Sequence, residues 1–243
     1  MRTVNVMKTM FVLAGGFGTR LRPVVSDVPK PLAPVEGKSF LERLIDVWKR
    51  DGITEVVLLL HYQADMVLDL IERMKKDGRL ENMRVRSITE PAPLGTGGAI
   101  NHALRLFGIS ESFLVANADT WLDTGVHAML DTIPGTIGVV EVPNTERYGS
   151  VLLEGEAIVT FQEKQHSSGP GWINAGLYHL SPEMFVDWPD GSSFSLEQEI
   201  FPVLAKKSSL FSKKLDTEFI DIGIPEDYLK FCEWVRLGEV NGL

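Results

Sequence analysis

The segment MFVLAGG, residues 10–16, joins a short apolar run to two glycines. The apolar run, residues 10–13, is typical of a buried strand, and the glycines after it indicate a tight loop. Because glycine has no Cβ, backbone N–H groups in such a loop can turn toward a bound anion. The segment therefore predicts a strand that carries an anion-binding loop at its end.

Helix and strand patterns alternate after this loop. Ser39 and Glu42 form a capping box at the start of a helix that Gly52 ends, and residues 55–60 are a continuous aliphatic run typical of a covered parallel strand. Further predicted elements are a helix over 65–76, a strand over 85–88, a helix over 97–107 and a strand over 113–116. This order predicts a doubly wound α/β sheet with ligands beyond the carboxyl ends of its strands.

The pattern changes after Val126, where short strand-like segments predict a partly antiparallel extension of the sheet. These segments cover residues 136–142, 150–153, 158–161 and 172–180. Ser195 with Gln198 predicts another capped helix. Residues 219–222 predict a last strand, and Pro225 begins a terminal helix.

Composition limits the class of partner. The 243 residues are 44% hydrophobic and carry a formal net charge of -9, which argues against a nucleic-acid surface. Arg20, Arg22 and Lys30 concentrate positive charge locally, which suits a small anion. The single cysteine, Cys232, excludes an intramolecular disulfide, and no apolar run approaches the length of a membrane span. We expect one cytoplasmic domain over 1–243, with no nucleic-acid or membrane partner.

Two familiar phosphate-binding motifs do not fit the glycine-rich segments. The dinucleotide fingerprint needs a glycine where Leu21 stands and a helix that the nearby prolines prevent. A P-loop ending at Ser39 needs a glycine where Leu32 stands, and Ser39 is more simply a helix cap. Taken alone, the first glycine segment is also consistent with an ordinary structural turn.

A wider comparison of motifs identifies a family. LAGGFGTRLRP at residues 13–23, followed by PKPLAPV at 29–35, resembles the signature of the nucleoside-diphosphate-sugar pyrophosphorylases, which are nucleotidyltransferases. The resemblance continues through EPAPLGTGG at 90–98, NAD at 117–119, FQEK at 161–164, INAG at 173–176 and DIGIPEDY at 221–228. It implies a Rossmann-like doubly wound mixed sheet without the carboxyl-terminal β-helix of many relatives. It also implies a nucleotide-binding half over 1–125 and a sugar-phosphate-binding half over 126–243.

The resemblance implies that a sugar 1-phosphate attacks a nucleoside triphosphate and pyrophosphate leaves. Positioning and charge stabilisation supply most of the catalysis in such a displacement. Arg20 would hold the β- and γ-phosphates in bidentate fashion, and Lys30 would meet the α-phosphate as a point charge. Without the family context, both would be solvated surface charges. The predicted nucleotide-binding residues are Leu13, Gly15, Gly16, Gly18, Thr19, Glu90, Gly95 and Thr96.

Asp119 and Asp221 are the predicted ligands of Mg²⁺, the expected cofactor, and Asp119 is also counted with Arg20 and Lys30 as catalytic. Each aspartate follows or ends a predicted strand. Mg²⁺ is usually held by one or two carboxylates together with phosphate oxygens, so two converging aspartates suit a triphosphate site. The structural alternative is a turn or a helix cap, which aspartate also favours.

The sugar phosphate is expected to contact residues that the family resemblance singles out. In similar enzymes a lysine at the position of Lys164 binds the sugar's phosphate, and residues at the positions of Glu163 and Asn174 bind its hydroxyls. Glu197 is predicted on the same side. Proline usually follows the lysine, whereas Gln165 stands here. The five histidines show no metal-ligand spacing.

Glu90 favours GTP, because guanine offers two adjacent donors, N1–H and the 2-amino group, to a carboxylate. The structural alternative is that Glu90 braces the following turn. RYGSV at 147–151, FSLE at 194–197 and FIDIG at 219–223 look most like the D-glycero-α-D-manno-heptose 1-phosphate guanylyltransferases. The alternatives are a mannose 1-phosphate guanylyltransferase, a hexose or muramate 1-phosphate uridylyltransferase, and a non-catalytic nucleotide-sugar sensor. A homodimer is left open.

Overall fold

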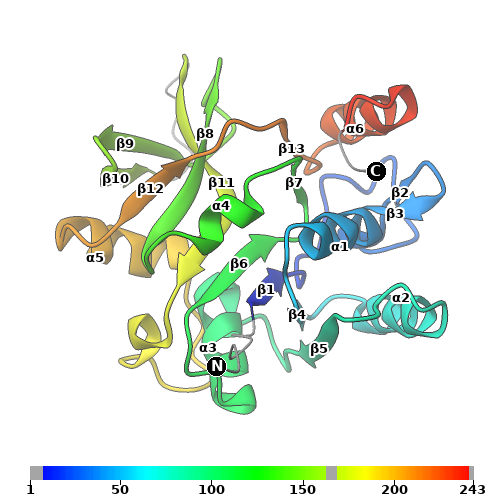
Figure 1. The fold of residues 1–243 in the computed structure, drawn as a ribbon, viewed down its shortest axis with the longest axis horizontal. Coiled ribbons are helices and arrows are strands. Elements are labelled where there is room, and N and C mark those ends of the chain that lie inside the picture. Colours follow the sequence, from blue (N-terminus) through cyan, green and yellow to red (C-terminus); the bar gives the residue numbers. More distant parts are fainter. Residues whose placement is uncertain (1–7, 163–168, 241–243) are drawn as a thin grey trace, which may run out of the picture.

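The computed structural model describes residues 8–162 and 169–240. Its centre is a nine-stranded sheet in the spatial order β5-β4-β1-β6-β11-β8-β12-β10-β9 (Figure 1). In that order the strands are Arg84–Thr89, Glu55–Leu60, Thr9–Leu13, Phe113–Asn117, Gly171–Leu180, Thr136–Val142, Phe211–Lys214, Ala157–Gln162 and Ser150–Glu154. No helix in these residues is long and apolar enough to cross a bilayer.

The first four strands in space form the predicted parallel half of the sheet. β1 pairs in parallel with β4 and β6, and β4 pairs in parallel with β5. Successive β1 residues point to opposite faces, so Val12 packs in one hydrophobic core and Phe11 in the other. The first core is covered by α1 (Phe40–Arg50), α2 (Ala64–Lys76) and α6 (Pro225–Leu237), and the second by α3 (Gly95–Phe107) and α5 (Phe201–Lys206). The doubly wound prediction is confirmed.

The second half extends the sheet with mixed strand directions. β11 runs antiparallel to both β6 and β8, whereas β12 runs parallel to β8. The mixed sheet is therefore confirmed, although β12 was not predicted. A short helix, α4, covers Val126–Leu130, and single helical turns cover Lys30–Leu32 and Pro182–Phe185. No β-helix follows in the described chain.

Two small ladders lie outside the main sheet. β2 (Pro34–Val35) pairs with β3 (Lys38–Ser39), directly before α1. β7 (Thr120–Leu122) pairs antiparallel with β13 (Phe219–Asp221). The predicted last strand therefore exists, but it belongs to this separate ladder.

One of the two predicted capping boxes needs correction. At α1 the box is confirmed, because Ser39 N–H donates to Glu42 Oε2 at 2.7 Å and Glu42 N–H donates to Ser39 Oγ at 3.3 Å. At Ser195 the side chain that accepts from the Ser195 N–H is that of Glu199, at 2.8 Å, and not that of Gln198. The turn Leu196–Ile200 is π-helical, and its wider winding moves the partner one residue along the chain.

Candidate active site

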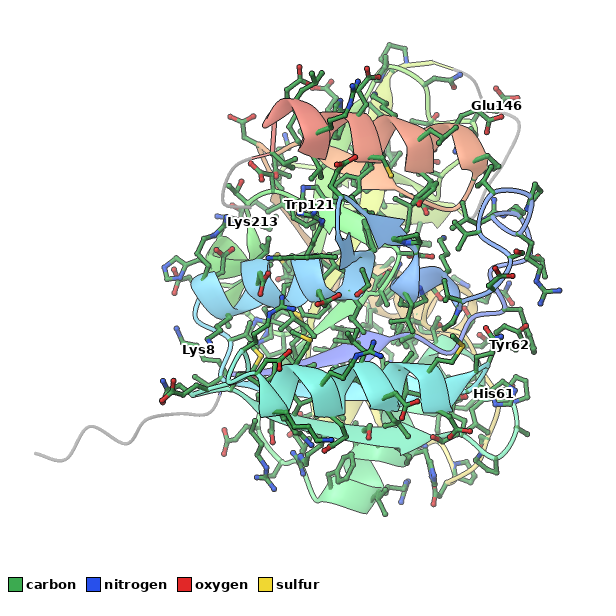
Figure 2. The ribbon with its side chains drawn as sticks, turned by 90° about the vertical axis from the view of Figure 1, so that its right-hand side faces the viewer. Lys8, His61, Tyr62, Trp121, Glu146 and Lys213 are labelled. Atoms are coloured by element: carbon green, nitrogen blue, oxygen red, sulfur yellow. The ribbon has the colours of Figure 1, made fainter. Side chains whose placement is uncertain are left out.

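Three cavities lie beyond the carboxyl ends of β1, β4 and β6, and Asp119 lines all of them. Figure 2 shows His61 and Tyr62 on this side of the molecule, just past the end of β4. The glycine-loop cavity, about 240 Å³, includes Gly16 to Arg20. The Glu90 cavity, about 370 Å³, extends to His61, and the Asn174 cavity, about 470 Å³, extends to Glu197. Because Asp119 lines all three, the cavities are adjacent. They could therefore hold neighbouring parts of two molecules that react with each other.

Lys30 joins the two aspartates predicted to bind metal. Its Nζ lies 2.7 Å from Asp119 Oδ2 and 3.3 Å from Asp221 Oδ1, and its side chain is only 10% exposed. The β7–β13 ladder brings these carboxylates together, because Asp221 pairs with Thr120 and Ile222 N–H donates to Asp119 O at 2.9 Å. The predicted convergence of the two aspartates is therefore present in the fold.

The guanidinium of Arg20 also lies at this cluster, because a Cβ on Gly223 would be 3.2 Å from Lys30 Nζ and 3.4 Å from Arg20 Nη2. Burial and the charge of Asp119 raise the pKa of Asp221, although Lys30 and the Gly223 N–H oppose the rise. The two neighbouring carboxylates, Asp119 and Asp221, are a donor set that fits a divalent cation with additional phosphate oxygens. No group of three or more His, Cys, Asp or Glu suited to a metal occurs among the described residues.

Glu90 is 7% exposed and forms one wall of its cavity. Its Oε2 accepts from Leu94 N–H at 2.9 Å, so the carboxylate braces the following turn, as the structural alternative predicted. Its Oε1 lies 3.2 Å from the position that a Cβ on Gly15 would occupy, so this oxygen borders the glycine loop. Burial raises the pKa of Glu90. One carboxylate therefore has both a structural bond and an oxygen beside the predicted nucleotide loop.

A bulge in β11 forms the floor of the Asn174 cavity. Asn174 Oδ1 accepts from Gly176 N–H at 2.9 Å, and its Nδ2 donates to Tyr178 Oη at 2.9 Å. Gly176 has φ +67°, and a Cβ there would lie 2.7 Å from Asn117 Nδ2, so this position requires glycine. Complete burial raises the pKa of Tyr178 well above its ordinary value, which keeps its hydroxyl protonated. The bulge fixes the orientation of the Asn174 amide at the cavity.

Residues 94–98 and 194–197 are hydrogen-bonded to each other and form a wall beside the Glu90 and Asn174 cavities, and its Gly95 and Thr96 line both cavities. Gly97 and Gly98 N–H groups donate to Phe194 O at 3.0 and 3.2 Å, and Phe194 N–H returns a bond to Leu94 O at 3.0 Å. Thr96 Oγ1 donates to Glu197 Oε2 at 2.7 Å and accepts from Leu196 N–H at 2.9 Å. Because Thr96 lines both cavities, the predicted nucleotide and sugar residues meet at this wall.

Almost all predicted site residues gather at this edge of the sheet. The cavities are lined by Leu13, Gly15, Gly16, Gly18, Thr19, Arg20, Lys30, Glu90, Gly95, Thr96, Asp119, Asn174, Glu197 and Asp221. Glu163 and Lys164 lie outside the described residues. Arg147 and Tyr178 also line the Asn174 cavity and were not predicted, although Arg147 stands in the RYGSV motif that resembles the heptose 1-phosphate guanylyltransferases.

A doubly wound sheet with a glycine loop, Lys30 and two aspartates at the carboxyl edge of its strands is the arrangement of a nucleotide-transferring enzyme. Comparison with known proteins agrees with this class. Residues 9–236 match the protein family described as nucleotidyl transferase, and the chain belongs to that family. The sequence-based family assignment is thereby confirmed.

Individual relatives narrow the class of enzyme. The chain is 34% identical to the D-glycero-α-D-manno-heptose 1-phosphate guanylyltransferase of Campylobacter jejuni, over 90% of this chain and 96% of that one. It is 36% identical to mannose-1-phosphate guanyltransferase beta-B of Xenopus laevis, over 90% of this chain and 62% of that one. The structure of HddC from Yersinia pseudotuberculosis complexed with GMP-PN has a TM-score of 0.78 and 37% identity, covering 94% of this chain and all of that one. The chain is a sugar 1-phosphate nucleotidyltransferase.

Proposed function

We propose that this enzyme transfers GMP from GTP to D-glycero-α-D-manno-heptose 1-phosphate and releases pyrophosphate. The observation that carries the proposal is the position of Asp119, with Lys30 bound to it, at the junction of all three cavities. Glu90 supports GTP as the donor. The heptose is supported by relatives of that name from Campylobacter jejuni and, at 32% identity over 90% of this chain and 94% of that one, Aneurinibacillus thermoaerophilus.

Each cavity would take one part of the substrates. The guanine would enter the Glu90 cavity, the triphosphate the glycine-loop cavity, and the sugar 1-phosphate the Asn174 cavity. An oxygen of the sugar phosphate would then form a bond to the α-phosphorus as the bond to the β-phosphate oxygen breaks. Lys30 would offset charge at the α-phosphate, and Arg20, which lines both the glycine-loop and Asn174 cavities, would hold the leaving pyrophosphate.

Asp119 and Asp221 would hold Mg²⁺ in this proposal. The metal would neutralise phosphate charge and orient phosphate oxygens. The support is the convergence of the two carboxylates, which both contact Lys30. Lys30 would therefore share the aspartates with the metal when substrate is bound.

The sugar side rests on Asn174 and Glu197, which border the third cavity. Glu163 and Lys164 remain predicted ligands of the sugar hydroxyls and phosphate. A heptose has one hydroxyl-bearing carbon more than mannose, and a site that hydrogen-bonds this hydroxyl rejects the shorter sugar strongly. The proposal places the enzyme in the cytoplasm, which agrees with its single, unpaired cysteine.

A matrix of four nucleoside triphosphates against several sugar 1-phosphates, read out by pyrophosphate release, tests the proposed substrates. GTP with the manno-configured heptose 1-phosphate should give the highest kcat/KM. Equal turnover of mannose 1-phosphate would instead support the mannose enzyme, a second candidate that the 36% identical Xenopus relative favours. A preference for UTP would contradict both the Glu90 argument and the heptose assignment, and would leave nucleotidyl transfer itself intact.

Glu90→Gln should reduce the preference for GTP over UTP by about 1–3 kcal/mol, because one charged acceptor is lost. Glutamine can still accept from Leu94 N–H through its carbonyl oxygen, so the turn should persist. The measurement is kcat/KM with GTP, UTP and inosine triphosphate, which lacks the 2-amino donor. The wild type should prefer GTP to inosine triphosphate, and the variant should lose most of that preference.

The matched control for this variant is Glu111→Gln, which changes an exposed glutamate that lines none of the three cavities. Its triphosphate preferences should equal those of the wild type. An unchanged GTP preference in Glu90→Gln would show that Glu90 only braces the turn.

A further inference from the structure

We infer that Arg147 binds the phosphate group of the acceptor sugar 1-phosphate, an inference that rests on the proposed function. Arg147 lies between β8 and β9, and it lines the Asn174 cavity together with Tyr148, Asp119 and Asp221. Its side chain is 47% exposed, so a ligand in the cavity can reach it. Arg147 belongs neither to the predicted nucleotide-binding residues nor to the predicted sugar-phosphate-binding residues.

The guanidinium of Arg147 is held in place on two sides. Its Nη2 lies 2.5 Å from Asp227 Oδ2, near the start of α6. Its Cζ lies 5.8 Å from the centre of the Tyr148 ring, and that ring packs edge-on against Phe219 at 5.5 Å. Arginine has five N–H donors in a planar fork, so the bond to Asp227 leaves donors for a phosphate. The group is therefore oriented before any substrate arrives.

Its position favours the phosphate over the sugar ring. Burial lowers the pKa of Arg147, but the hydrogen bond and charge of Asp227, with a further contribution from Asp221, outweigh burial and raise it. Arg147 and Asp221 line the same cavity, and the Asp221 carboxylate contacts Lys30 at 3.3 Å. The acceptor phosphate must lie near this end of the cavity, because it has to reach the α-phosphorus beside Lys30.

The charged side chains around the Asn174 cavity also favour Arg147 as the phosphate ligand. The cavity's described lining contains three carboxylates, Asp119, Asp221 and Glu197, and two cations, Arg20 and Arg147. Arg20 also borders the glycine-loop cavity, where the proposed function assigns it to pyrophosphate. Among the described lining residues, Arg147 is then the remaining cation that can attract a dianionic acceptor. The other charged side chains of the lining have a negative sum.

A purely structural role for Arg147 makes a different prediction. If Arg147 only ties the β8–β9 loop to α6, then removing either partner of its ion pair should have the same effect. Asp227→Asn weakens the ion pair but leaves the guanidinium at the cavity. Asp227 lines none of the three cavities, so it is a matched control for Arg147.

The experiment compares Arg147→Ala, Arg147→Lys and Asp227→Asn with the wild type. Steady-state kinetics would use GTP and the best sugar 1-phosphate of the substrate matrix, with inorganic phosphate as a competitive inhibitor against the sugar phosphate. Arg147→Ala should raise the KM for the sugar 1-phosphate at least about 10-fold and weaken phosphate inhibition by a similar factor. The KM for GTP should change less than about 3-fold. Asp227→Asn keeps an amide oxygen that can accept from Arg147 Nη2, so it should raise the acceptor KM less than Arg147→Ala does. Lysine should restore part of the loss.

Three results would overturn the inference. They are an unchanged acceptor KM in both Arg147 variants, equal defects in Arg147→Ala and Asp227→Asn, and a raised acceptor KM without weaker phosphate inhibition. The last would place Arg147 at the sugar ring. Failure of the proposed function would appear separately, as a wild type that transfers nothing or prefers other substrates in the matrix. Calorimetric titration of wild type and variants with inorganic phosphate tests Arg147 even then.

Discussion

Arg20→Ala should lower turnover by about 10²–10⁴-fold at saturating substrates, because pyrophosphate would leave with its charge unbalanced. Arg20 is exposed and lines both the glycine-loop and Asn174 cavities, so it faces the space between donor and acceptor. Arg20→Lys should recover only part of the activity, because lysine lacks the bidentate fork. Turnover is measured by pyrophosphate release in the presence of excess Mg²⁺.

Arg22→Ala provides the matched control for Arg20. Arg22 belongs to the same loop, but its guanidinium lies 5.4 Å from the centre of the Tyr62 ring and lines none of the three cavities. Its loss should change turnover less than about 3-fold. Complete rescue of the Arg20 site by lysine would show that charge alone matters there, and the geometric argument would be wrong.

Asp119→Asn and Asp221→Asn should each lower turnover at least about 10²-fold, similar to the loss of one major electrostatic stabiliser. Each substitution keeps the side chain's shape and removes one of the two carboxylates that face Lys30. The fold should persist, because both side chains are partly exposed, at 37% and 27%. The half-saturating Mg²⁺ concentration should also rise, because a ligand charge is lost.

Asp46→Asn controls for the loss of an ordinary lysine–carboxylate pair. Asp46, on α1, pairs with Lys38 at 2.8 Å and with Arg79 at 3.2 Å and lines none of the three cavities, so its substitution should leave turnover and Mg²⁺ dependence nearly unchanged. Full activity of either site variant would refute the metal assignment. Undiminished wild-type turnover in excess chelator would refute it as well.

The parts of the fold that follow from local sequence were predictable. The residues of β4 are all buried, so its apolar run identified a strand without knowledge of its neighbours, and the Ser39 cap marked the start of α1. β12 was missed because its FSKK sequence ends in two exposed lysines, and its strand geometry depends on pairing with the distant β8. The residue that accepts from Ser195 N–H was predicted one position too early, because no local sequence pattern indicates a π-helical turn.

In the site, too, the residues within local motifs were predictable, whereas contacts between distant segments were not. The glycine loop, Lys30 and Asp119 carry recognisable motifs, so their gathering could be expected. The meeting of Asp119 with Asp221 depends on the β7–β13 ladder, which joins segments about a hundred residues apart. Arg147 could be seen in its motif, but its orientation comes from Asp227, on a helix that packs there only in the folded chain. The roles of Glu163 and Lys164 remain predictions.

The wall beside the Glu90 and Asn174 cavities limits how such an enzyme can be redesigned for another acceptor. A Cβ on Gly97 would lie 2.2 Å from the Phe194 ring, and one on Gly98 would lie 2.2 Å from Ser192 O. Neither glycine can therefore accept a side chain while residues 94–98 and 192–194 keep their places. Acceptor specificity is therefore better altered at Glu197, which lines the Asn174 cavity, than by adding side chains at these two glycines.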